Sequence, residues 1–189
     1  MNIQNINNEL LEKLLHLKEE DTTFTFWLRR KKDGLENGQW FQGSDSYISV
    51  GLIRTNSGNL STKSFALQIN LHENSLEGSL LLYDRNFEKS DLKNFYHELS
   101  KSMTEIKPNL LWERKLDSSN GLDSIVKDFW TFYPQFKELV TEFNIDEEHI
   151  ISQEDFSKSL TKVLEFKSQL KNIKDSQNES VQGRKFWIY

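Results

Sequence analysis

A run of four basic residues close to several aromatic ones is the feature of the sequence with the most recognisable chemistry. The run extends from Arg29 to Lys32, after Trp27 and before an aromatic stretch that begins at Trp40. Clustered cations pair with phosphates, and exposed rings stack on unpaired bases. The alternative is that the charges are merely solvated and the rings belong to the core. The residues predicted to contact nucleic acid are Arg29, Arg30, Lys31, Lys32, Trp40, Phe41 and Tyr47.

A second pattern, Glu113-Arg114-Lys115, lies in a predicted strand. With an upstream carboxylate such as Asp84, a Glu-x-Lys strand would resemble the metal-binding core of restriction-type nucleases. Charges on a solvent-facing strand explain the same three residues equally well. A small metal-dependent nuclease is therefore kept as an alternative reading.

Other catalytic chemistry finds no support in the sequence. The chain has no cysteine, which excludes thiolate chemistry and disulfides. No phosphate-binding GxxxxGK[ST] loop, no GxGxxG and no GxSxG occurs. The histidines are far apart, and we expect none of them to have a carboxylate at metal-ligand spacing. We expect no catalytic residue, metal or cofactor, and no hydrolysis of GTP or ATP.

The composition indicates one soluble domain. The chain has 189 residues, 36% hydrophobic and 28% charged, with a net charge of −5, so any basic surface must be local. No apolar run approaches the roughly 20 residues of a membrane span, and the amino terminus lacks a secretory layout. The expectation is a cytoplasmic protein without a membrane partner.

Hydrophobic periodicity predicts the elements that must position these residues. Steps of three or four predict helices, and β-branched or alternating segments between short turns predict antiparallel strands. The expected fold is α+β: an antiparallel sheet of four to six strands, an N-terminal helix, and a C-terminal group of three or four helices. Helices are expected over 3–19, from 90 to about 103, over 122–143 with a kink or break at Pro134, and from Ser152 to about 170. Strands are expected over 22–28, 39–43, 47–54, 65–71, 76–83 and 110–116, and a turn over 29–38.

The chain divides into three parts by composition. Residues 1–173 form the predicted α+β recognition domain, and the polar segment 174–184 is predicted to be a linker. Residues 185–189, Lys-Phe-Trp-Ile-Tyr, are interpreted as the first strand of a following domain in a truncated chain. A tail strand folding back on the domain is the alternative.

The stretch QWFQGSDSYISVGL, residues 39–52, resembles the amino-terminal domain of certain McrB-like AAA+ restriction ATPases. In that group a Trp-Phe-x-Gly turn leads into a strand, and a further strand resembles residues 63–70 here. The ending RKFWIY is similar to the aromatic strand that opens the next module in such proteins. The resemblance covers about 20–70 and the last six residues.

This resemblance implies a role without a reaction in this part of the protein. McrB-like proteins are NTP-driven motors of modification-dependent restriction that work with a McrC-like nuclease, and their amino-terminal domains select the target. We therefore expect a monomeric, non-catalytic DNA-recognition domain of a phage-defence protein, with a McrC-like partner contacted through the motor. The alternative is a protein-interaction module that binds a partner subunit or a phage protein through an exposed apolar face.

Overall fold

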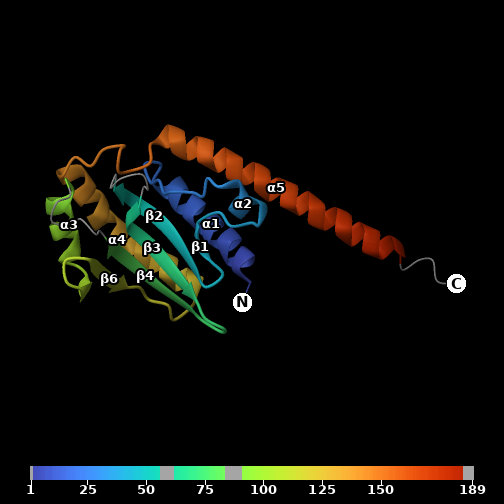
Figure 1. Ribbon diagram of the computed structural model, residues 1–189, viewed down its shortest axis with the longest axis horizontal. Coiled ribbons are helices and arrows are strands. Elements are labelled where there is room, and N and C mark those ends of the chain that lie inside the picture. The colour runs from blue at the N-terminus through green and yellow to red at the C-terminus, as the bar shows by residue number, and fades with distance from the viewer. Residues whose placement is uncertain (1, 56–61, 84–90, 185–189) are drawn as a thin grey trace.

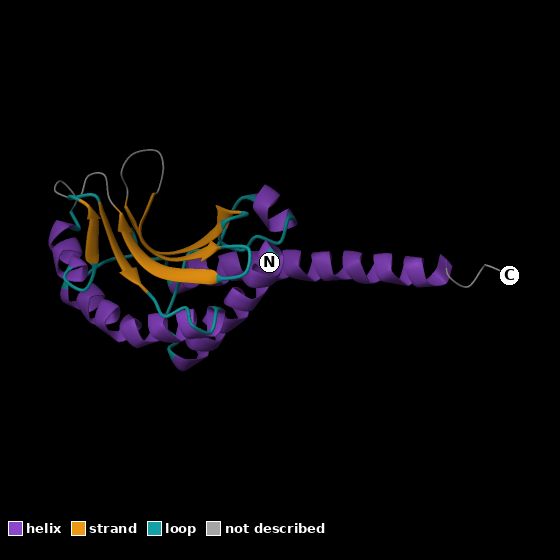
Figure 2. Cartoon of the chain, turned by 90° about the horizontal axis from the view of Figure 1, so that it is seen from below, coloured by secondary structure: helices purple, strands orange, loops and turns teal. Residues whose placement is uncertain are grey.

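A curved, six-stranded antiparallel sheet with helices packed on one face forms the body of the protein (Figures 1 and 2). The computed structural model describes residues 2–55, 62–83 and 91–184, and of 55, 62–63 and 174–184 the backbone only. The strand order is β1-β2-β3-β4-β6-β5. The strands are β1 Gln42–Ser44, β2 Tyr47–Thr55, β3 Thr62–Leu71, β4 Leu76–Tyr83, β5 Thr104–Lys107 and β6 Leu111–Lys115. The expected α+β class is confirmed.

The described residues form five helices. They are α1 Ile3–Glu20, α2 Lys32–Glu36, α3 Lys93–Ser100, α4 Leu122–Glu142 and α5 Gln153–Arg184. Helix α1 begins at the N-cap Asn2, whose side chain accepts a hydrogen bond from the Gln4 amide at 2.8 Å. Helix α5 extends well beyond the body of the molecule (Figures 1 and 2). In the described part of the chain, no helix is both long and apolar enough to cross a membrane.

The strand register separates an apolar face from a polar one. Val50, Leu67 and Leu80 lie opposite one another on adjacent strands and are buried on the face that packs against α4. The packing is close at Gly78, where a Cβ atom would lie 2.5 Å from Cγ2 of Ile125 on α4. A side chain at residue 78 would therefore force α4 away from the sheet.

The other face of the sheet is concave and carries no helix among the described residues (Figure 2). The alternation that directs Val50 and Leu67 to the helices directs their neighbours to this face. Small residues among these neighbours are Ser49, Gly51, Ala66 and Ser79, and larger ones are Gln68 and Leu81. The concave face therefore combines small polar and apolar positions with longer side chains.

Two expectations about the strands and turns were wrong, and one strand was missed. Residues 22–28 form no strand, since only an isolated bridge joins Trp27 to Gly51. Three segments contact the outer edge of β2 one after another. Strand β1 pairs with the first residues of β2, Trp27 pairs with Gly51, and the His149 carbonyl accepts the Arg54 amide. The expected turn over 29–38 contains α2, and β5 was missed.

Helices α4 and α5 also differ from expectation. Helix α4 continues as one helix through Pro134. The predicted cap of α5 is present, because Oγ of Ser152 accepts the Asp155 amide at 3.1 Å. Residues 174–184 have a helical backbone as the last part of α5, so the segment expected as a linker has regular structure. Residues 185–189 lie outside the described part of the chain.

Candidate functional site

The segment that carries the basic run is fixed to the body by its alternate residues. Phe24, Phe26 and Leu28 are buried, with Phe24 against Tyr133 of α4 and Phe26 against Phe156 of α5. The intervening Trp27 donates its amide to the Gly51 carbonyl at 2.9 Å. Residues 24–28 are all buried, and the chain reaches the surface at Arg29 and Arg30, where the basic run begins.

Arg29 has a structural task. Its Nε donates to the Phe41 carbonyl at 2.8 Å and its Nη2 to the Gly43 carbonyl at 3.3 Å. The side chain lies over Gly34, where a Cβ atom would be 2.2 Å from Cδ of Arg29. Arg29 therefore holds the start of β1 and α2 together, and only part of its positive charge faces the surface.

Cations from α5 converge on the same place. Arg29 and Arg30 line a hollow of about 260 Å³ together with Lys158 and Lys162, which are one turn apart on α5. Nζ of Lys162 donates to the Arg30 carbonyl at 3.2 Å, which joins α5 to the basic run. We call this site the basic hollow; its lining residues are Arg29, Arg30, Asp155, Lys158, Ser159 and Lys162.

The charge balance of the basic hollow is positive. Four of its lining residues are basic and Asp155 is the one acidic residue among them. Lys158 pairs with Glu154 at 2.5 Å, but both side chains are largely exposed, and such pairs contribute little. Lys158 can therefore exchange this partner for an anion in the hollow.

A further cation lies next to the basic hollow. The Arg54 guanidinium lies 3.4 Å from the centre of the Trp27 ring, and that of Arg30 lies 5.3 Å from it. Burial, together with the positive charge of Arg30, lowers the pKa of Arg54 to about 10, so Arg54 stays charged at neutral pH. Arg30 and Arg54 thus add to one electropositive region at the β2 edge.

The predicted site residues divide into four groups. Arg29 and Arg30 line the basic hollow, whereas Lys31 and Lys32 do not, and Lys32 pairs with Glu36 at 3.3 Å. Trp40 and Phe41 are each only 1% exposed, so both rings lie in the core, which is the alternative that the sequence left open. The backbone amide of each donates to the buried side chain of Asn7 on α1, which holds this segment against the helix. Tyr47, at the start of β2, is 38% exposed.

Two groups of residues contribute to this region and were not predicted. Lys158 and Lys162 were missed, although a spacing of four on a predicted helix places them on one face. Arg54 was missed because its contact with Trp27 arises from pairing along the β2 edge. A search for basic pairs on helix faces could have found the two lysines, but not their position beside Arg30.

The structure describes only part of the nuclease-like pattern formed by Glu113, Lys115 and Asp84. Glu113 and Lys115 lie on the concave face of β6, opposite Leu81 and Ser79 of β4. Asp84, the third residue of the nuclease hypothesis, lies outside the described residues. The nuclease hypothesis stays a prediction.

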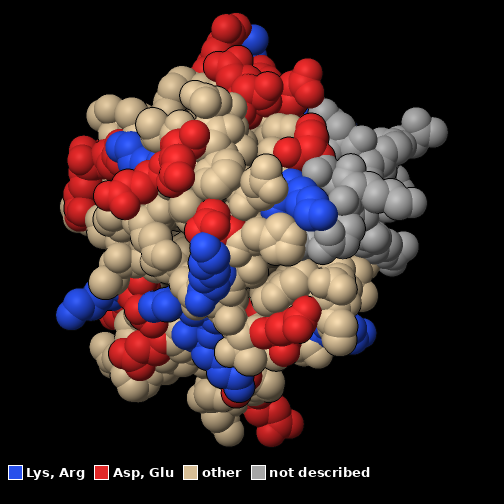
Figure 3. Space-filling model, turned by 90° about the vertical axis from the view of Figure 1, so that its left-hand side faces the viewer, with Lys and Arg blue, Asp and Glu red and all other residues tan. Residues whose placement is uncertain are grey.

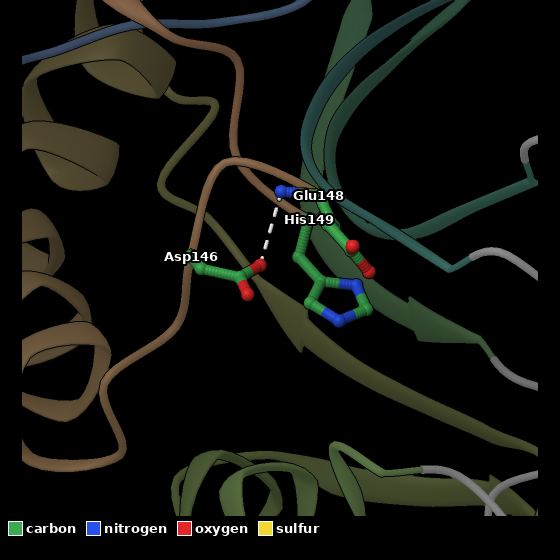
Figure 4. Close-up of side chains that lie close together, drawn as sticks. All are labelled: Asp146, Glu148 and His149. Atoms are coloured by element: carbon green, nitrogen blue, oxygen red, sulfur yellow. Dashed lines mark hydrogen bonds between the residues drawn. The ribbon is translucent and has the colours of Figure 1, made fainter.

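A group of potential metal ligands lies in the loop before α5 (Figure 4). Asp146, Glu148 and His149 each place a ligand atom within 4.8 Å of the others, so the expectation that no histidine has carboxylates nearby does not hold for His149. Oδ1 of Asp146 accepts the Glu148 amide, and Nδ1 of His149 lies 2.8 Å from the Arg54 carbonyl. The carbonyl fixes Nδ1 as the donor, so the His149 contact attaches the loop to β2, whereas the Asp146 contact lies within the loop.

Charges elsewhere on the surface are mixed. At the end of the molecule that carries α3, patches of both signs alternate (Figure 3).

Comparisons with protein-family models, with curated proteins and with solved structures find no match. The assignment of a function therefore depends on the geometry of the chain itself.

Proposed function

We propose that this protein is a non-catalytic DNA-recognition domain that holds backbone phosphate in the basic hollow. The observation that carries the proposal is the convergence of Arg30 with Lys158 and Lys162 around a hollow with a single lining carboxylate. Clustered cations bind a phosphate chain because each neutralised phosphate releases condensed counterions. The role that the resemblance to McrB-like proteins implies agrees with this proposal.

The hollow has a suitable size and chemistry for a phosphate group. Its volume of about 260 Å³ is below the range typical of pockets for drug-sized molecules. Ser159 adds a hydroxyl donor to the ammonium and guanidinium groups. The site is therefore suited to one phosphate at a time, with Arg54 beside it to attract the next along the chain.

The net charge of −5 limits what this site can do. A long duplex lying on the whole surface would meet many carboxylates, whereas a contact confined to the β2 edge meets mainly cations. We expect weak binding to plain duplex and tighter binding to a preferred target. Phosphate contacts position the chain, and base contacts select the sequence.

The apolar surface gives less support to a protein-interaction module. Among the described residues, the large hydrophobic side chains that are exposed are Tyr47, Ile106, Leu164 and Ile173. They belong to β2, β5 and α5, and single exposed hydrophobic residues are normal on protein surfaces. A partner-binding surface would require a contiguous patch of several hundred square ångströms.

The test is the salt dependence of DNA binding, measured by fluorescence anisotropy on a labelled duplex. The variant combines Arg30→Ala, Lys158→Ala and Lys162→Ala, and leaves Arg29 in place because Arg29 supports the fold. We expect weaker binding and a plot of log affinity against log salt that is flatter by about 0.9 for each phosphate that the variant no longer neutralises.

A matched control carries Lys101→Ala, Lys107→Ala and Lys127→Ala, three exposed lysines outside the hollow. It makes the same change in net charge, so it separates a local contact from a general loss of attraction. The proposal is wrong if both triple variants lose affinity and salt dependence equally. It is also wrong if the native chain binds no duplex or single strand at low salt.

A further inference from the structure

The concave face of the sheet contains a small polar hollow that is separate from the basic hollow. It measures about 210 Å³ and shares no lining residue with the basic hollow. Its lining residues are Asn70, Glu77, Gly78, Ser79, Glu113, Lys115, Leu116 and Ser118. We call it the sheet-face hollow.

One of its lining residues, Ser79, has a buried hydroxyl without a hydrogen-bond partner. Ser79 is 3% exposed, and its Oγ makes no hydrogen bond. Neighbouring polar groups are satisfied: Nε2 of Gln68 donates to Oδ1 of Asn70 at 2.9 Å, and Oγ of Ser118 accepts the Gly78 amide at 3.0 Å. A buried polar group left unpaired costs free energy, so the Ser79 hydroxyl is poised to bind a polar ligand.

Two opposite charges border this hydroxyl without neutralising each other. Lys115 lies directly across the strand pair from Ser79, and Glu113 lies two residues earlier on the same face of β6. Among the described residues, neither Glu113 nor Lys115 forms an ion pair. Glu77, on β4, adds a carboxylate on the other side of Ser79, and its one ionic neighbour in the described part of the chain is the exposed His72, at 3.5 Å.

We propose that the sheet-face hollow binds a free α-amino acid in its zwitterionic form. The ligand carboxylate would pair with the Lys115 ammonium and accept a hydrogen bond from Ser79, because these two groups lie in one row. The ligand ammonium would pair with Glu113 on one side of that row, because Glu77 on the other side already has His72 as an ionic neighbour. Such charge-assisted hydrogen bonds are the strong ones in binding sites.

The volume and chemistry of the hollow narrow the ligand class further. A hollow of about 210 Å³ holds only a small side chain in addition to the two charged groups. A ligand with a single charge would leave either Lys115 or the carboxylates unpaired. A simple cation or a simple anion is therefore a poorer fit than a zwitterion.

The test uses the whole chain and titrates it calorimetrically with L-alanine, L-alaninamide and propionate. L-alaninamide keeps the ammonium but lacks the carboxylate, and propionate keeps the carboxylate but lacks the ammonium. We expect saturable binding of L-alanine at millimolar concentration or below, and binding at least about tenfold weaker for both analogues. No saturable binding of L-alanine, or equal binding of either analogue, would overturn the proposal.

Variants locate the site. Lys115→Met and Glu113→Gln should each weaken L-alanine binding by roughly tenfold or more, and Ser79→Ala should weaken it by less. Lys107→Met, which removes an exposed lysine from the neighbouring strand β5, should leave binding unchanged. Unchanged affinity in both Lys115→Met and Glu113→Gln, with the fold intact by circular dichroism, would overturn the assignment. DNA binding does not enter this experiment, so its outcome is independent of the proposed function.

Discussion

Replacing Asn7 by Leu should destabilise the protein far more than replacing its neighbour Asn8. Asn7 is 2% exposed, and its Oδ1 accepts the backbone amides of Trp40 at 3.0 Å and of Phe41 at 3.4 Å. These bonds fix the chain before β1 to helix α1. In the same segment, the Trp40 carbonyl accepts the Arg29 amide at 2.7 Å. Because Arg29 lines the basic hollow, Asn7 also supports the edge of that hollow.

The magnitude follows from the groups that lose a partner. Leu has a similar size but no acceptor, so two buried amides would be left unpaired at about 1–3 kcal/mol each. The 3.4 Å contact is at the weak end of hydrogen-bond geometry, so the amide of Phe41 loses less than that of Trp40. We expect the free energy of unfolding to fall by about 2–4 kcal/mol.

Urea denaturation of Asn7→Leu and Asn8→Leu measures this difference, provided the slope of the transition stays constant. Oδ1 of Asn8 accepts Nε1 of Trp40 at 2.9 Å, but this contact is only partly buried and water can replace it. Asn8→Leu should therefore cost about 1 kcal/mol or less. Equal losses in the two variants, or a loss below about 1 kcal/mol for Asn7→Leu, would refute the role of Asn7 as a buried acceptor.

Two further predictions concern packing and pH. Gly78→Ala should lower the free energy of unfolding by about 1–3 kcal/mol in urea denaturation, because its Cβ would collide with Ile125; an unchanged midpoint would contradict the close packing of α4 on β4. Burial alone would raise the pKa of Asp21, but hydrogen bonds from Lys137 and Thr23 outweigh it and lower the pKa to about 2. Because this is below the unfolded value of about 3.9, Asp21 stabilises the fold above pH 4 and loses that effect as the pH falls toward 2. Thermal unfolding of Asp21→Asn should show a deficit at pH 5 that disappears near pH 2, and a deficit constant over that range would show that the ion pair is not the cause.

Much of the fold was predictable because periodicity reports burial directly. The spacing of Ile6, Leu10, Leu14 and Leu17 predicts α1, and all four are buried. The prediction of a strand over 22–28 was wrong for a different reason. Its β-branched and aromatic residues fit the pattern of a strand, but a strand forms only where a free sheet edge is available for pairing. Strand β5 was missed because all four of its residues are exposed, so no apolar alternation marks it.

The candidate site was less predictable than the fold. The sequence shows that Arg29 and Arg30 are basic and adjacent. It cannot show that Arg29 donates hydrogen bonds to backbone carbonyl groups while Arg30 faces the hollow. The backbone of Trp40 and Phe41 is bonded to Asn7, more than thirty residues earlier, and a contact at that separation cannot be seen in the local pattern. Lys158 and Lys162 reach Arg30 only because α5 returns across the body of the molecule.

The most direct test of phosphate binding in the basic hollow is a nuclear magnetic resonance titration of the isotope-labelled chain with a short DNA duplex. The backbone amides of Arg30, Ser159 and Lys162 should shift together and saturate, and the shifts should shrink as salt is raised. The amides of Lys101 and Lys107 should stay in place. Shifts confined to the concave face of the sheet, or to the end of the molecule that carries α3, would contradict the proposed function.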